Sequence, residues 1–212
     1  MNKISNFKSF LINEEYSKNT PIPELINNEE KLGIILLGLP GSGKSTFAKD
    51  IIFKYQKNIK IFSTDDVSYK FTKDPNIYHK KSSKININYL NNYIKTGQNY
   101  VYDTTGVSRH NVFKIFNKSR ENGYKVIFIL ILVDIESAKN QNINRYKSGG
   151  HKVDKEFIEY VYSEQLSTTK EFLNLNPDSF YIVNNKSGKY KYYKHTGNEI
   201  LKRKVNKYIP IK

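Results

Sequence analysis

The chain of 212 residues contains no cysteine. Disulfide bonds, thiolate zinc sites and cysteine nucleophiles are therefore excluded. The four histidines show no metal-ligand spacing, so a zinc centre is not expected either. A chain of this length can bury the core of one ordinary domain without such cross-links.

Long apolar runs are also missing. The longest unbroken run, Val126–Val133, is far shorter than the roughly 18 residues that a membrane-spanning helix needs. The first residues, Met1–Leu11, are polar and lack the apolar centre of a signal peptide. We therefore expect a soluble, cytoplasmic protein that has no membrane partner.

Acidic residues are scarce beside basic ones. The sequence has 35 Lys and Arg against 20 Asp and Glu, which gives a net charge of +15. Such an excess favours an anionic partner, such as a nucleic acid or a nucleotide. Lys, Asn, Ile and Tyr are all abundant, and an AT-rich coding sequence produces the same bias. Both explanations of the charge stay open at this point.

Short apolar runs alternate with segments of helical periodicity along most of the chain. This order predicts an α/β fold with a mostly parallel sheet that helices cover on both faces. The strands are expected at 32–37, 59–62, 99–102, 125–133 and 180–183. The helices are expected at 45–55, 86–94, around 112–116, 136–145 and 154–175.

Residues Gly38–Ser45, GLPGSGKS, fit the pattern G-x-x-x-x-G-K-[ST] directly between an expected strand and an expected helix. Glycines let successive backbone N–H groups face phosphate oxygens, and the helix start adds its positive end. Lys44 can reach the terminal phosphates, and the Ser45 hydroxyl can bind Mg²⁺. The sequence therefore predicts a site for ATP and Mg²⁺. The expected nucleotide contacts are Gly38, Pro40, Gly41, Ser42, Gly43, Lys44, Ser45 and Thr46.

Carboxylates follow the next two expected strands. Asp65 and Asp66 come after the second strand, and Asp103 after the third. The carboxyl ends of parallel strands line the ligand crevice of an open sheet. Phosphoryl transfer needs one carboxylate to accept a proton and can use another to organise the metal. We assign Asp66, or alternatively Asp103, to the metal with Ser45; the competing interpretation is that these aspartates cap helices or turns.

Basic residues surround a glycine pair late in the chain. Arg145, Lys147 and Lys152 flank Ser148-Gly149-Gly150, a pattern that suits a lid closing over phosphates. The alternative is a solvated, lysine-rich turn. Arg109 follows the third strand and can reach a substrate phosphate. The remaining basic segments, His79–Lys84 and Tyr190–Lys194, belong either to an anion-binding groove or to an ordinary wet surface.

Four segments, taken in order, resemble the P-loop kinases of the polynucleotide kinase and zeta-toxin group. They read GLPGSGKSTFAKD, FSTDD, YDTTG and NRYKSGGHKV, and the resemblance covers roughly residues 32–185. It implies that Asp65 is the general base, that Asp103 and Thr104 lie in the substrate site, and that Arg145 contacts the transferred phosphate.

The implied activity is transfer of the γ-phosphate of ATP to a hydroxyl of a polynucleotide or a nucleotide-like acceptor. A zeta-toxin-like kinase of small molecules, such as nucleotide sugars, and a nucleic-acid-binding NTPase are the alternatives. The chain departs from polynucleotide kinases in two places. No arginine follows Asp66 closely, and their second lid arginine has no clear counterpart here, since Lys147 or Lys152 would replace it only as a point charge.

Three segments are expected along the chain. Residues 1–30 are expected to form an N-terminal arm, residues 31–185 the P-loop kinase domain, and residues 186–212 a basic C-terminal extension.

Overall fold

The computed structural model describes residues 31–53, 56, 58–71, 79–150, 152–186 and 189–195. The expected N-terminal arm and the end of the expected C-terminal extension, 196–212, lie outside the described residues. His151, which follows the glycine pair Gly149-Gly150, lies outside them as well.

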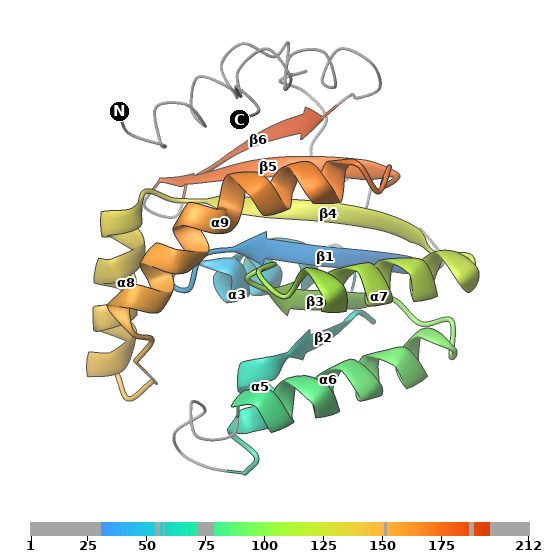
Figure 1. The fold of residues 1–212 in the computed structure, drawn as a ribbon, viewed down its shortest axis with the longest axis horizontal. Helices are drawn as coiled ribbons and strands as arrows, with labels where there is room; N and C mark the ends of the chain where they lie inside the picture. The colour runs from blue at the N-terminus through green and yellow to red at the C-terminus, as the bar shows by residue number, and fades with distance from the viewer. Residues whose placement is uncertain are drawn as a thin grey trace, which may run out of the picture.

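A six-stranded sheet with the order β2-β3-β1-β4-β5-β6 forms the centre of the molecule (Figure 1). The first five strands in this order are parallel, and β6 runs antiparallel to β5. The predicted α/β class with a mostly parallel sheet is thus confirmed. The strands are β1 (Leu32–Gly38), β2 (Lys60–Ser63), β3 (Tyr100–Thr104), β4 (Lys125–Leu132), β5 (Ser179–Lys186) and β6 (Lys189–His195).

Each expected helix is present, with some shifted ends. The helix after β1 is short and continues as a π-helical turn, and the helix before β3 begins seven positions earlier than its apolar pattern indicated. One further helix, of five residues, follows β2. The helical elements are α3 (Lys44–Phe47), η1 (Ala48–Ile52), α5 (Thr64–Ser68), α6 (His79–Ile94), α7 (Arg109–Glu121), α8 (Ile135–Lys147) and α9 (Lys155–Leu173).

Helices cover both faces of the sheet. Ile35 and Leu37 of β1 belong to the core that α6, α7 and α9 close, whereas Ile34 and Leu36 belong to the core that α3 and η1 close. Figure 1 shows α7 and α9 in front of the sheet and α3 behind it. Because both faces are covered, β1 is buried along its whole length and reads as one apolar run.

The strands β1, β2 and β3 all end at the same edge of the sheet, next to α3, α5 and α8 (Figure 1). The register there places Asp103 beside both Leu36 of β1 and Ser63 of β2. The loop after β1 and the carboxylates after β2 and β3 therefore meet in one place. Among the described helices, none is both long and apolar enough to cross a membrane.

Candidate active site

The glycines of the loop between β1 and α3 allow its backbone to turn tightly. Gly41 and Gly43 have φ angles of 77° and 86°, in the left-handed region that favours glycine. A Cβ atom on Gly41 would collide with the carbonyl oxygen of Ala138 in α8. A Cβ atom on Gly43 would lie 2.7 Å from Nδ2 of Asn185. The loop thus fits between α8 and β5 only with glycine at these two positions.

Lys44 folds back over this loop. Its Nζ donates to the carbonyl oxygens of Gly38, at 3.0 Å, and of Leu39, at 2.8 Å. Burial lowers the pKa of Lys44, while Asp103 and Asp65 attract its charge and raise the pKa, and Arg145 repels it. The ammonium group therefore lies within electrostatic reach of two carboxylates and one guanidinium.

Ser45 and Asp103 face each other across the ends of β1 and β3. The Ser45 hydroxyl donates to Oδ2 of Asp103 at 3.5 Å. Burial raises the pKa of Asp103, the Lys44 charge lowers it, and Asp65 and Asp66 raise it again. A hydroxyl and a carboxylate are the oxygen ligands that Mg²⁺ prefers. Nowhere in the described part of the chain do three His, Asp or Glu side chains cluster as a metal cage, so phosphate and water oxygens would have to complete the coordination.

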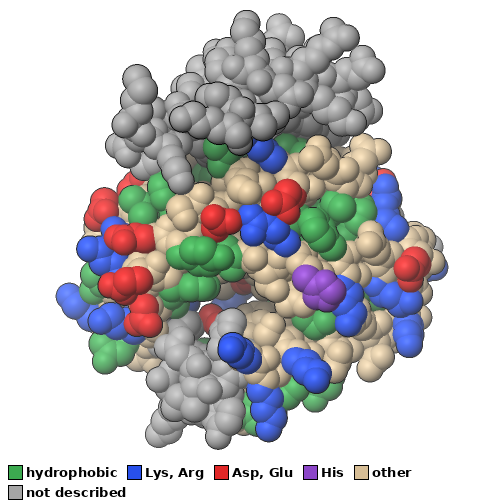
Figure 2. Space-filling model, viewed as in Figure 1, with side chains coloured by type: hydrophobic (Ala, Val, Ile, Leu, Met, Phe, Trp, Pro, Cys, Tyr) green, Lys and Arg blue, Asp and Glu red, His purple; other side chains and the backbone are tan. Residues whose placement is uncertain are grey.

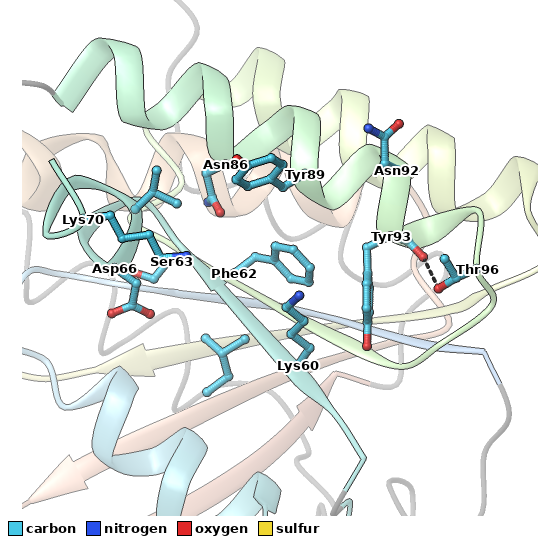
Figure 3. Close-up of a pocket in the computed structure, with 12 residues that line it drawn as sticks. Lys60, Phe62, Ser63, Asp66, Lys70, Asn86, Tyr89, Asn92, Tyr93 and Thr96 are labelled. Carbon is cyan, nitrogen blue, oxygen red and sulfur yellow. Dashed lines mark hydrogen bonds between the residues drawn. The ribbon is translucent and has the colours of Figure 1, made fainter.

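The two aspartates of α5 lie in different surroundings. Asp65 is half-buried and interacts electrostatically with Lys44 and Asp103. Asp66 is exposed and lines a pocket between β2 and α6 (Figure 3). Although much of the residue is exposed, partial burial of its carboxyl group and the neighbouring Asp65 raise the pKa of Asp66, while Lys49 and Lys70 lower it. The structure thus brings Ser45 next to Asp103, and it places Asp66 toward the pocket.

Arg145 lies in the last turn of α8 and donates from Nη2 to Oδ1 of Asn142 at 3.2 Å. Gly149, at φ 86°, reverses the chain, and the N–H of Gly150 returns to the carbonyl oxygen of Arg145 at 2.9 Å. Asn142 also donates to the carbonyl oxygen of Val153 at 2.8 Å and accepts from its N–H at 3.2 Å. The segment predicted as a lid therefore contains a turn, and the Asn142 side chain connects its two ends by hydrogen bonds to Arg145 and Val153.

Arg109 is held by partners on α9. It begins α7, and its guanidinium binds Glu164 at 2.8 Å and Glu171 at 2.9 Å, both on α9. It also donates to the Ser167 hydroxyl at 3.0 Å. The sequence predicted a substrate contact, but these three partners hold the side chain against α9. Thr104, the other predicted substrate residue, accepts from the N–H of Gly106 at 3.2 Å.

Sequence reasoning missed Asn185. This residue of β5 is buried, and its Nδ2 donates to the carbonyl oxygen of Ser42 at 3.0 Å. In a trans peptide the C=O and N–H groups point in opposite directions. Holding the Ser42 carbonyl against β5 therefore turns the N–H of Gly43 to the other side. The doublet of asparagines at the end of a late apolar strand was the only signal in the sequence.

Charge is mixed on the face of the molecule that carries α7 and α9. Figure 2 shows Lys and Arg spread among Asp and Glu on the face that carries α7 and α9, with a hollow between this layer and the α6 side below it. On α6, Lys81 lies 6.0 Å from the centre of the Phe71 ring. The tyrosines and lysines of 190–194 form part of β6, and their side chains lie outside the described part of the structure.

Known structures share this fold. A chain of the PezAT chromosomal toxin–antitoxin system of the human pathogen Streptococcus pneumoniae matches with a TM-score of 0.64 and 19% identity, over 81% of this chain and 74% of that chain. A chain of AvrRxo1-ORF1:-ORF2 with ATP matches with a TM-score of 0.63 and 13% identity, over 84% and 64%. A chain of the Pnkp1/Rnl/Hen1 RNA repair complex matches with a TM-score of 0.56 and 21% identity, over 82% and 51%.

This chain thus spans less than two thirds of the second and third of these chains. A comparison with the curated proteins finds no significant match. The family model described as zeta toxin matches residues 16–198, which is most of the sequence. The P-loop, the carboxylates at the neighbouring strand ends and this match agree on a kinase-like, nucleotide-binding protein, and the chain belongs to the zeta-toxin family.

Proposed function

We propose that this protein is an ATP-dependent kinase that transfers the γ-phosphate to a hydroxyl of a polynucleotide or a nucleotide-like acceptor. One observation carries the proposal: Lys44 folds back on the carbonyl oxygens of the phosphate-binding loop, and the neighbouring Ser45 donates to Asp103 at the end of β3 at 3.5 Å. The charges of Asp65 and Arg145 also act on Lys44. Phosphoryl transfer needs a cation on the phosphates, a carboxylate for the metal, a carboxylate for the acceptor proton and a cation on the transferring group. The chain offers one candidate for each role around a single loop.

The nucleotide phosphates would lie in the wrap of the loop. Its N–H groups, including that of Gly43, would bind phosphate oxygens, and Lys44 would exchange the carbonyl oxygens of Gly38 and Leu39 for the terminal phosphates. Ser45 and Asp103 would hold Mg²⁺ through their oxygen atoms. When bound, Mg²⁺ supplies neutralisation of the charge on the β- and γ-phosphates.

The transfer step assigns a separate role to Asp65. The acceptor hydroxyl forms a new O–P bond to the γ-phosphorus, and its proton passes to the Asp65 carboxylate. The bond between the γ-phosphorus and the bridging β,γ-oxygen breaks, and ADP leaves with that electron pair. Arg145 would stabilise the charge on the phosphoryl oxygens during the step.

Two related activities use the same groups. A zeta-toxin-like kinase would phosphorylate a small acceptor such as a nucleotide sugar, whereas an NTPase would transfer the phosphate to water. The resemblance of the four sequence segments to polynucleotide kinases favours a strand end as acceptor, and their resemblance to zeta-toxin-like kinases favours a small molecule. Either acceptor leaves the proposed roles of Lys44, Asp65, Asp103 and Arg145 unchanged.

The test is incubation of the protein with γ-labelled ATP, Mg²⁺ and separate acceptors: an oligonucleotide with a 5′-hydroxyl, a nucleoside monophosphate, a nucleotide sugar, and buffer alone. We expect label on one of the acceptors, little free phosphate in buffer, and neither with Lys44→Ala. If the label appears only as free phosphate with every acceptor, the protein is an NTPase and the kinase proposal is wrong. Failure to bind ATP at all would overturn both.

A further inference from the structure

Helix α8 lies directly against the phosphate-binding loop. Its buried residues, Ala138 and Asn142, are about one helical turn apart. A Cβ atom on Gly41 would collide with the carbonyl oxygen of Ala138 and would lie 3.3 Å from the backbone nitrogen of Asn142. Leu39 of the loop packs in one apolar cluster with Ala138 and with Ile158 of α9. The buried face of α8 is therefore fixed relative to the loop that would bind the phosphates.

Asn142 is polar, yet only 3% of its surface is exposed. Both ends of its amide bind the backbone of one residue, Val153, which comes just before the N-cap of α9. Nδ2 donates to the carbonyl oxygen of Val153 at 2.8 Å, and Oδ1 accepts from its N–H at 3.2 Å. Because one end of the amide donates and the other accepts, the amide has a single favourable orientation. The Asn142 oxygen is thus held in a defined place between α8 and the start of α9.

The same oxygen restrains Arg145, because it accepts a hydrogen bond from Nη2 of the guanidinium at 3.2 Å. The turn that follows packs against the aliphatic part of this arginine. A Cβ atom on Gly150 would lie 2.7 Å from Cγ of Arg145 and 3.0 Å from its carbonyl oxygen. An amide oxygen is neutral, so its hydrogen bond limits the directions that the guanidinium can take and leaves the positive charge in place.

The charge of Arg145 acts at the phosphate-binding loop. Burial lowers the pKa of Lys44, and repulsion from Arg145 lowers it further. A cation that faces the transferring phosphoryl group is most effective when it is already oriented, because no reorganisation is then needed during the step. A misplacement of about 1 Å can cost roughly 10²-fold in rate. A residue that orients this guanidinium should therefore affect the rate of transfer.

We propose that Asn142 is a positioning residue for phosphoryl transfer: it fixes the guanidinium of Arg145 beside the phosphate-binding loop, and it acts on the rate through that arginine. The backbone of α8 contacts the loop, Val153 orients the Asn142 amide, and the amide oxygen orients the arginine. The effect on rate rests on the proposed kinase function, which gives Arg145 its role on the transferred phosphate. The restraint itself belongs to the ligand-free protein and is measured separately.

Nuclear magnetic resonance of the ligand-free protein tests the restraint. The side-chain N–H signals of Arg145 are identified by their loss in Arg145→Ala. We expect separate Nη signals in the unaltered protein, because a hydrogen-bonded guanidinium rotates slowly, and averaged signals in Asn142→Ala. The Arg109 signals are an internal reference, since Glu164 and Glu171 hold that guanidinium in both proteins. Unchanged Arg145 signals in Asn142→Ala would overturn the proposal, whether or not the protein transfers phosphate.

A double-mutant cycle tests the effect on rate. The loss of γ-phosphate from saturating ATP and Mg²⁺, to an acceptor or to water, is measured in the unaltered protein, in Asn142→Ala, in Arg145→Ala and in the double variant. We expect Asn142→Ala to slow the step about tenfold when Arg145 is present, and by less than about twofold when it is absent. Equal slowing in the two backgrounds would show that Asn142 only supports the fold, and would overturn the proposal.

Affinity for a non-hydrolysable ATP analogue separates the arginine from the loop. It should stay within about twofold in Asn142→Ala, because the loop and Lys44 are unaltered. A loss of analogue affinity as large as the loss of rate would show that Asn142 supports the loop instead of the arginine. Asn144→Ala is the matched control: it removes the same amide from an exposed position of α8 and should change neither signals, rate nor affinity.

Asn142→Asp is the second variant, because it keeps the size of the side chain and should fold where alanine leaves a gap. Its carboxylate still accepts from Arg145 but also pairs with the charge. The Arg145 signals should therefore persist while the rate falls, again only when Arg145 is present. An unaltered rate in Asn142→Asp would overturn the proposal. If the γ-phosphate passes only to water, the kinase proposal fails, and the cycle still decides the role of Asn142.

Discussion

Asn185 donates its side-chain amide to the carbonyl oxygen of Ser42 over 3.0 Å, and the two residues lie 143 positions apart in the chain. The contact joins the phosphate-binding loop to β5. It fixes the orientation of one peptide bond and hence the direction of the Gly43 N–H.

Asn185→Ala should weaken binding of an ATP analogue by about tenfold, because the peptide then turns freely and a buried carbonyl loses its partner. Fluorescence or calorimetric titration measures the effect. Asn184→Ala is the control: its side chain leaves the opposite side of β5, so its affinity should stay within about twofold. Equal losses in the two variants would indicate general damage to β5 instead.

Lys44→Ala should abolish nearly all phosphoryl transfer, because it removes the side-chain charge held at the loop that would bind the terminal phosphates. Folding should be nearly unchanged, since burial already lowers the pKa of this lysine and so disfavours its charged form. Turnover and urea unfolding are measured on the same preparation. A folded variant with unaltered turnover would refute the nucleotide assignment.

Asp65→Asn should separate binding from turnover. Loss of a general base costs roughly 10²–10⁴ in rate, whereas the loop and Lys44 keep the affinity for ATP and Mg²⁺ within a few-fold. Asp66→Asn is the neighbouring control and should cost less, because Asp66 is exposed, whereas Asp65 is half-buried and interacts electrostatically with Lys44. Reversed effects would show that the two roles are exchanged, and two active variants would leave Asp103 as the candidate base.

Asp103→Asn should make the ligand-free protein more resistant to urea at pH 7. Burial raises the pKa of Asp103 above its ordinary value of 3.8, so the folded protein binds this proton more tightly than the unfolded chain does. Its contribution to stability is therefore lost as the pH rises from the unfolded to the folded pKa. Unfolding curves at pH 4 and pH 7 check this: the unaltered protein should lose more stability between them than the variant.

The same Asp103→Asn exchange should weaken Mg²⁺-dependent binding of ATP, because a neutral amide is a poorer magnesium ligand than a carboxylate. A variant that gains stability and loses magnesium dependence fits both roles. A variant that loses stability at pH 7 would show that the attraction to Lys44 outweighs the cost of burying the carboxylate.

Arg109→Ala tests whether this residue acts on substrate or on the fold. Its two partly exposed ion pairs with Glu164 and Glu171 predict a loss of about 1 kcal/mol in the free energy of unfolding. Removal of Glu164 should have a similar effect on stability and none on the acceptor KM. A rise in acceptor KM in Arg109→Ala alone would support the substrate contact that the sequence predicts.

The sequence predicted the central strands well because β1 and β4 are buried on both faces, and such strands are unbroken apolar runs. The loop after β1 was predictable for a different reason. Its backbone needs glycine at φ 77° and 86°, and the resulting spacing of glycines is a motif that is visible in the sequence. The short helix α5 was missed because five residues hold too little periodicity to detect.

Contacts between distant segments were not predictable. Nothing near Arg109 in the sequence indicates that Glu164 and Glu171 of α9 will hold it, and nothing near Ser42 indicates Asn185. The proposed roles of Asp65 and Asp66 depend on the direction in which each side chain points from the short helix α5. Spacing along the chain carries little information about such direction when the turn is so short.

The order of the strands also bears on how this protein can change over generations. The contacts that hold the phosphate-binding loop come from β5 and α8, on one side of β1. The pocket between β2 and α6 lies on the other side, beside the outermost strand of the sheet. Substitutions in that outer flank can therefore change the pocket without touching the contacts that hold the loop. Under the proposed kinase function, a library confined to β2 and α6 should yield folded variants that keep their affinity for an ATP analogue.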